Sequence, residues 1–154
     1  MKPDLFAPTR RQAATGAALA AMAAILAPRM AFADPGMVAA EIKKLYGDKK
    51  FATGKIKLDI PEIAENGNVV PVTVEVESPM TDNDYVAAVH LFAEGNPLPA
   101  VATFRFTPAC GKAAASTRMR LAQTQDVICI AEMSTGALFS ARANVKVTIG
   151  GCGG

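Results

Sequence analysis

Short runs of alternating apolar and polar residues dominate the chain from Lys55 onward, and proline or glycine closes most of them. Successive side chains of a β-strand point to opposite faces, so a period of two predicts half-buried strands. One run, residues 55–60, ends at Pro61, and the next, residues 69–77, places four valines on one face. Pro71 within this second run predicts an edge position or a bulge at its start, because proline has no N–H to donate.

Five further strands are expected at residues 85–93, 100–107, 116–122, 126–132 and 137–149. Residues 85–93 are more uniformly apolar, which is typical of a strand buried on both faces. About seven short strands with a turn signal every 8–15 residues predict an all-β fold, an immunoglobulin-like antiparallel β-sandwich. His90 falls inside one run, and we interpret it as a strand residue with a satisfied ring rather than as a ligand or base.

A short N-terminal helix is expected before the strands, within residues 36–50. Val38, Ile42 and Leu45 recur at helical spacing and would form its apolar face, which Met37 and Tyr46 would extend. Gly47 is expected to end the helix.

The first 33 residues are organised like an export signal. Arg10 and Arg11 precede an apolar run over residues 13–27, and residues 31–33 supply the small side chains that a signal peptidase requires. The run is shorter than the about 20 apolar residues that cross a bilayer. The paired arginines favour the twin-arginine route, the alternative being an ordinary secretory signal that carries two arginines. We expect a periplasmic protein that begins at Asp34 and keeps no membrane segment.

Removal of this signal changes the charge balance. The whole chain has 16 basic and 14 acidic residues, and residues 34–154 have 12 basic and 13 acidic residues. No basic stripe with interleaved aromatic residues is present, which argues against a nucleic-acid partner. The expected organisation is a signal at 1–33, a helical segment at 34–54, a sandwich domain at 55–149 and a carrier arm at 150–154.

Motifs for an enzyme site are missing from the sequence. It contains no Ser/His/Asp grouping, no zinc-type Cys/His spacing and no phosphate-binding glycine loop. We therefore expect no catalytic residues, no metal and no cofactor.

The expected mature chain has three cysteines, an odd number for an oxidising compartment, so at least one is a free thiol or has an intermolecular partner. Cys110 follows a strand and Cys129 lies within one. These two either form a disulfide or remain unlinked, because their separation in space is not fixed by their spacing in the sequence.

Cys152 lies beyond the last strand, between Gly150-Gly151 and Gly153-Gly154. Glycine removes side-chain bulk and permits almost any backbone conformation, so we expect a flexible arm. At about 3.3–3.6 Å per extended residue, the thiol would reach about 10–15 Å from the domain. A catalytic cysteine requires a nearby base or electropositive group, and no such group closely precedes Cys152 in the sequence. Cys152 is therefore expected to be presented to the active sites of other proteins.

Two other roles for the cysteines remain open. Cys152 would serve as an intermolecular disulfide tether in a structural sandwich subunit. A thiol–disulfide oxidoreductase using Cys110 and Cys129 is the third reading, but the chain lacks a C-x-x-C motif and a βαβ pattern.

The C-terminal residues VTIGGCGG resemble the end of the SoxY family, the sulfur-substrate carriers of the bacterial thiosulfate-oxidising (Sox) system. The similarity covers roughly residues 56–154 and includes AENGNVVPVTVEVESP, EGNPLPAVATFRF and STRMRLAQTQDV. The twin-arginine signal is also similar to that of the family. Cys110 and Cys129 depart from the family's pattern and leave open an extra disulfide or redox role.

The resemblance implies an immunoglobulin-like sandwich that forms a heterodimer with a second β-sandwich subunit, SoxZ. It also implies that Cys152 carries the substrate as a thiosulfonate- or persulfide-type adduct. A c-type cytochrome pair would attach thiosulfate oxidatively, a dimanganese hydrolase would release sulfate, and a sulfane dehydrogenase would oxidise the remaining sulfur. The chain itself would be a carrier and not an enzyme.

Overall fold

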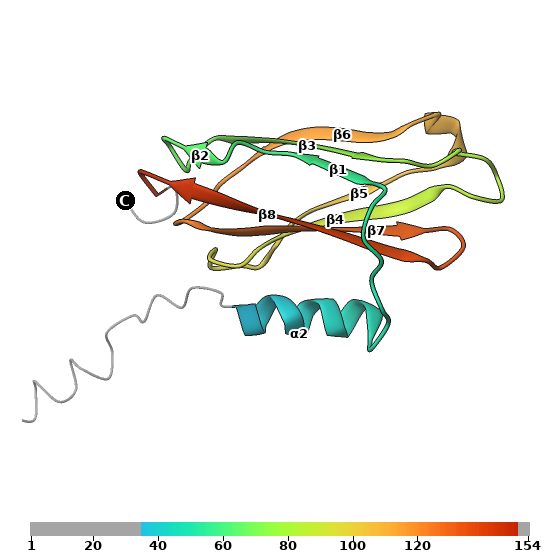
Figure 1. The fold of residues 1–154 in the computed structure, drawn as a ribbon, viewed down its shortest axis with the longest axis horizontal. Helices are drawn as coiled ribbons and strands as arrows, with labels where there is room; N and C mark the ends of the chain where they lie inside the picture. The colour runs from blue at the N-terminus through green and yellow to red at the C-terminus, as the bar shows by residue number, and fades with distance from the viewer. Residues whose placement is uncertain (1–34, 151–154) are drawn as a thin grey trace, which may run out of the picture. The chain divides into compact units, whose positions relative to one another are not determined.

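The computed structural model describes residues 35–150, so the expected signal peptide and Cys152 lie outside the described residues. The described chain begins with helix α2 (Pro35–Tyr46) and continues through eight strands (Figure 1). The strands are β1 (Ile56–Asp59), β2 (Ile63–Ala64), β3 (Val70–Val76), β4 (Val86–Ala93), β5 (Ala100–Arg105), β6 (Ala113–Met119), β7 (Gln125–Met133) and β8 (Leu138–Val147). A short 3-10 helix, η1 (Pro108–Cys110), connects β5 to β6.

The strands form two sheets. One has three strands in the order β1-β3-β6, and the other has five in the order β2-β8-β7-β4-β5. All neighbours are antiparallel except β2, which runs parallel to the end of β8. The predicted immunoglobulin-like antiparallel sandwich with a short helix in front is confirmed. The two-residue strand β2 was not expected from the sequence.

The main core lies between the two sheets. Four valines of β3 are buried on one face, as their alternation predicts: Val70, Val72, Val74 and Val76. Burial also alternates from the end of β6 to residue 121, where Met119 and Leu121 are buried while Arg118 and Arg120 are exposed. The alternation of burial along these segments is what fixes which face of each strand meets the other sheet.

Helix α2 covers the outer face of the five-stranded sheet, on the side away from the three-stranded sheet (Figure 1). Its Val38 and Tyr46 pack with Phe92 of β4 and with residues of β7 and β8. This second cluster explains why β4 is apolar on both faces. The predicted apolar face of the helix is confirmed for Val38 and Tyr46, which are buried, and was wrong for Leu45 and Met37, which are 51% and 43% exposed. No helix in the described part of the chain is long and apolar enough to span a membrane.

Pro71 was predicted to lie at a sheet edge or a bulge, and the structure agrees with the edge position only locally. It pairs with Arg118 of β6 inside the three-stranded sheet, and β3 is the middle strand of that sheet. The register of β1, however, ends opposite Thr73, so Pro71 has no partner strand on that side. The strand is therefore central as a whole but has a local edge where its proline lies.

Candidate functional site

Cys152 lies outside the described residues, but the structure shows how the chain is held just before it. On one side, backbone N–H groups of the C-terminal segment bond to the segment after β1. Lys146 donates to the carbonyl of Glu62 at 2.8 Å, and Thr148 donates to that of Ala64 at 3.0 Å. The carbonyl of Ile149 accepts the N–H of Gly67 at 2.7 Å. Regular pairing therefore continues two residues past the end of β8.

On the other side, the same segment contacts the connection between β6 and β7. The N–H of Val147 donates to Thr124 Oγ1 at 3.0 Å. A Cβ placed on Gly150 would collide with the carbonyl oxygen of Ala122 and would lie 3.3 Å from its carbonyl carbon. We call residues 64–67, 120–124 and 147–150 the exit site, since Gly150 is the described residue nearest to Cys152 in the sequence.

Gly150 is the residue of the predicted arm that lies within the described chain. It packs against the Ala122 backbone so closely that a Cβ would not fit. Glycine at this position permits the close approach of two backbones. Gly151, Gly153 and Gly154 lie outside the described residues, so their role as an arm stays a prediction.

Two buried amide side chains lie beneath the exit site. Asn96 is 8% exposed and Gln125 is 6% exposed, and they are hydrogen-bonded to each other at 3.0 Å. The Asn96 side chain also bonds to the backbone of Arg120 and Ala122. Sequence reasoning missed both residues, because Asn96 lies between two expected strands and Gln125 lies just before another.

The other two cysteines are free thiols, so the disulfide considered between Cys110 and Cys129 is not formed. Cys129 is 0% exposed in the core, on β7, whereas Cys110 is exposed in η1. Burial raises the pKa of Cys129 to about 12, which leaves it protonated and unreactive at neutral pH. The N–H of Thr107 donates to Cys110 Sγ at 3.5 Å, and this contact lowers the pKa of Cys110. Cys110 is therefore the accessible thiol of the two.

His90 is a strand residue whose ring has a partner, as interpreted from the sequence. Its Nδ1 lies 3.0 Å from Thr103 Oγ1 on the neighbouring strand. The ring stacks on Phe92 and meets Tyr46 edge-on, with centroid distances of 6.3 and 6.0 Å. Burial lowers the pKa of His90, so the neutral ring is favoured.

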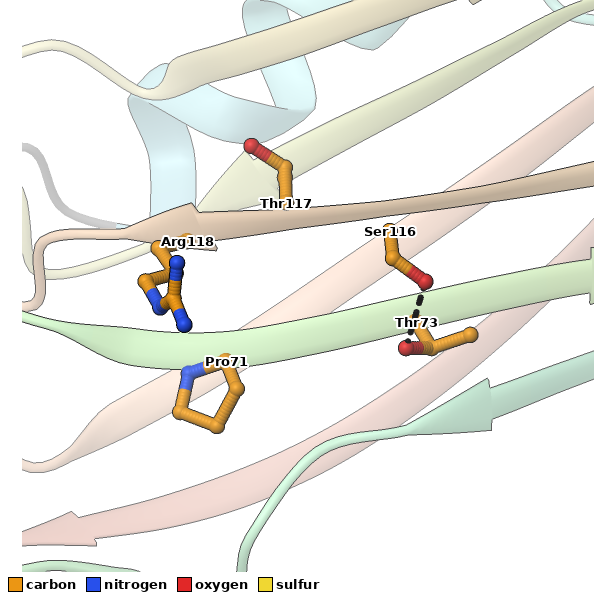
Figure 2. A pocket seen from close by; sticks show the side chains of 5 residues that line it. All are labelled: Pro71, Thr73, Ser116, Thr117 and Arg118. Carbon is orange, nitrogen blue, oxygen red and sulfur yellow. Dashed lines mark hydrogen bonds between the residues drawn. The ribbon is translucent and has the colours of Figure 1, made fainter.

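An open hollow of about 440 Å³ lies on the outer face of the three-stranded sheet (Figure 2). Its lining residues are Pro71, Thr73, Ser116, Thr117 and Arg118. Thr73 Oγ1 and Ser116 Oγ are 2.9 Å apart and hydrogen-bond to each other across the two strands. This lining contains no carboxylate, histidine or cysteine. Among residues 35–150, no group of three or more His, Cys, Asp or Glu side chains is placed to hold a metal ion.

Solved structures with the same fold include both a sulfur carrier and superoxide reductases. The sulfur carrier protein SoxY from Chlorobium limicola f thiosulfatophilum is 33% identical, with a TM-score of 0.62, and the match covers 74% of this chain and 98% of that one. A superoxide reductase (neelaredoxin) from Ignicoccus hospitalis, E23A, is 22% identical, with a TM-score of 0.56 and coverage of 62% and 82%. This second likeness concerns the fold alone.

A comparison with curated protein sequences finds no significant match. The chain does match the protein family described as "Sulfur oxidation protein SoxY" over residues 42–152. This match includes α2 from Ile42 onward, all eight strands and the exit site, and it ends on Cys152. The family match and the 33% identity to a solved SoxY agree with the resemblance seen in the sequence, and the chain therefore belongs to the SoxY family.

Proposed function

We propose that this protein is a periplasmic sulfur carrier that holds thiosulfate-derived sulfur on Cys152 and presents it to the enzymes of thiosulfate oxidation. The observation that carries the proposal is the family match, which runs through the whole sandwich and ends on Cys152. The Chlorobium relative is itself described as a sulfur carrier protein. The position of the exit site supports the proposal, because the chain is held up to Gly150, two residues before the thiol.

The loading step is an oxidative sulfur–sulfur bond formation. The thiolate of Cys152 and the terminal sulfur of thiosulfate join as Cys–S–S–SO₃⁻, and two electrons leave to a c-type cytochrome pair. Hydrolysis of the S–SO₃⁻ bond then consumes one water and releases sulfate and two protons, leaving a deprotonated persulfide, Cys–S–S⁻, on Cys152. In our proposal a dimanganese hydrolase catalyses this second step, and a sulfane dehydrogenase oxidises the remaining sulfur. The carrier supplies the sulfur atom that forms the bond and no catalytic group.

Cys152 fits this role better than the two cysteines within the domain. Cys129 is fully buried, and its raised pKa keeps it in the thiol form, whereas the thiolate is the nucleophile. Cys110 is exposed and has a lowered pKa, but it lies in the β5–β6 connection and outside the exit site. An experiment on the carrier must therefore distinguish Cys152 from Cys110.

The partners follow from the family and are part of the proposal. We propose a heterodimer with a SoxZ-like β-sandwich subunit, exported as a folded pair by the twin-arginine route. Replacement of Arg10 and Arg11 by lysine tests the route, because it should retain the carrier in the cytoplasm. Cell fractionation would show normal periplasmic accumulation if an ordinary secretory signal operates instead.

The carrier proposal is tested by mass spectrometry and respiration in cells fed thiosulfate. We expect a sulfur or thiosulfonate adduct on the peptide that contains Cys152, and Cys152→Ser should abolish thiosulfate-dependent respiration without affecting the fold. Cys110→Ser is the matched control and should respire normally. Respiration retained in the Cys152→Ser strain, or an adduct confined to Cys110, would refute the proposal. Obligate disulfide dimers on a non-reducing gel, with no sulfur adduct, would instead support a tether.

A further inference from the structure

We propose that Asn96 and Gln125 are positioning residues that fix the point at which the carrier segment leaves the domain. They act through the backbone of residues 120–124, against which Gly150 packs. This inference rests on the proposed function only in that the segment leaving the domain carries Cys152.

The first step is the burial of two polar side chains that have no part in the sheets' hydrogen bonding. Asn96 and Gln125 are the buried polar side chains of the described domain, at 8% and 6% exposure. A buried amide is destabilising unless its donors and acceptors are satisfied. Their hydrogen bonds therefore indicate what these two side chains hold in place.

The Asn96 side chain provides residues 120–124 with hydrogen bonds of the kind that a neighbouring strand would provide. Residues 120–124 lie between the end of β6 and the start of β7. Asn96 Nδ2 donates to the Arg120 carbonyl at 2.8 Å, and its Oδ1 accepts the N–H of Ala122 at 3.0 Å. A single amide thus bonds to the backbone on both sides of Leu121, as an adjacent strand would do.

Gln125 holds Asn96 in the orientation that this arrangement requires. Its Nε2 donates to Asn96 Oδ1 at 3.0 Å and to the Gln123 carbonyl at 3.1 Å. Its Oε1 accepts the N–H of Gly95 at 2.6 Å. Because each amide has a distinct donor and acceptor end, these bonds exclude the flipped rotamer of Asn96.

The positioned backbone then contacts the C-terminal segment in two ways. The Ala122 carbonyl faces Gly150 so closely that no Cβ would fit between them. The N–H of Leu121 donates to the Gly67 carbonyl at 2.8 Å, and the N–H of Gly67 donates to the Ile149 carbonyl at 2.7 Å. The backbone that the amide pair holds is therefore connected to Gly150 directly and to Ile149 through Gly67.

The consequence concerns the reach of the thiol. Two residue steps separate Gly150 from Cys152, and when fully extended they span at most about 7 Å between Cα atoms. A short linker gives a high effective concentration at a partner's site only when its origin lies within that span. Partner enzymes would therefore have to dock next to the exit site, and a displaced origin would lower their turnover.

Amide hydrogen exchange tests the connection between these groups. In Asn96→Ala, we expect the Leu121 and Gly67 amides to exchange at least tenfold faster, with the Val74 amide in the core unchanged. Asn68→Ala is the matched control, since Asn68 is an exposed asparagine that directly follows Gly67. Unchanged exchange at Gly67 in a folded Asn96→Ala protein would overturn the inference. If Asn96→Ala fails to fold, Gly150→Ala applies the same test from the surface, with the same two amides expected to exchange faster.

A spin label on Cys152 provides a spectroscopic measure of the exit point, in a Cys110→Ser and Cys129→Ala background. We expect the strongest broadening of amide signals at residues 64–67 and 120–124. In Gly150→Ala this broadening should fall at least twofold and spread to other amides, and an unchanged pattern would overturn the inference. Neither readout needs sulfur transfer. If Cys152 carries sulfur adducts but amide exchange and spin-label broadening are unchanged in the variants, only this inference is refuted. If exchange and broadening change as expected but Cys152 carries no adduct, only the carrier function is refuted.

Discussion

Leu121 joins the main core to the exit site, so its truncation measures how firmly the core supports that site. Its side chain is 0% exposed, and its N–H bonds to Gly67. Leu121→Ala removes three buried carbons, worth about 2.4 kcal/mol at about 0.8 kcal/mol per carbon. The cavity left by incomplete relaxation adds to this, so we expect a loss of about 3–4 kcal/mol in the free energy of unfolding.

Leu98 provides the matched control, because it is the same residue type and is 76% exposed. It lies two residues after Asn96 in the sequence, and both line a surface hollow with Arg120. Leu98→Ala should change the free energy of unfolding by less than about 0.5 kcal/mol. The two variants therefore differ in burial and not in the chemistry that is removed.

Urea unfolding followed by far-UV circular dichroism measures both variants. With a slope of about 2 kcal/mol per molar urea, the midpoint of Leu121→Ala should fall by about 1.5–2 M and that of Leu98→Ala by less than about 0.3 M. Equal shifts in the two variants, or a loss below about 1 kcal/mol for Leu121→Ala, would refute the assignment of Leu121 to the core.

Two further perturbations test a buried thiol and an ion-pair bridge. The pKa of Cys129 is raised by burial from 9.0 to about 12 in the folded chain, so the unfolded chain loses this proton first. The free energy of unfolding should therefore fall between pH 9 and about 12, by at most about 1.4 kcal/mol per pH unit. Thermal unfolding measured across this pH range should show a smaller decline for Cys129→Ala, which lacks the thiol. Arg142 bonds to Glu94 and Asp126 at 2.8 Å each. Because the Glu94 side chain is only 11% exposed, Arg142→Met should lower the free energy of unfolding by about 1–2 kcal/mol in urea titrations.

Each of these two predictions has a control of the same residue type. Cys110→Ala changes an exposed thiol and should keep the alkaline decline, while an undiminished decline in Cys129→Ala would contradict the assigned pKa. Arg118 is exposed and makes no ion pair within residues 35–150, so Arg118→Met should change stability by less than about 0.5 kcal/mol. A similar loss in both arginine variants, or a loss at Arg142 that 1 M salt does not reduce, would argue against the bridge.

The strands of this protein were predictable because their signal is local. Alternation in β3 and in residues 118–121 placed the buried face correctly, since burial against one other layer imposes a period of two. The family was also evident from the sequence, because the GGCGG end and the segments upstream are specific. The role of Cys152 remains a prediction, as that residue lies outside the described chain.

Other features depended on which elements become neighbours. Helical spacing made Leu45 and Tyr46 equally acceptable in the apolar face, and only the position of the five-stranded sheet buried Tyr46 and left Leu45 exposed. The strand β2 is two residues long and exists because it meets the end of β8. No property of its own residues distinguishes it from a loop.

The same distinction applies at the exit site. The sequence by itself determined the sandwich, the terminal thiol and the surrounding glycines. Only the tertiary structure revealed the demand on Gly150, because it comes from the Ala122 carbonyl, a group distant in the chain. Asn96 and Gln125 position that carbonyl through hydrogen bonds between segments distant in the chain, and such contacts leave no periodic signal in the sequence.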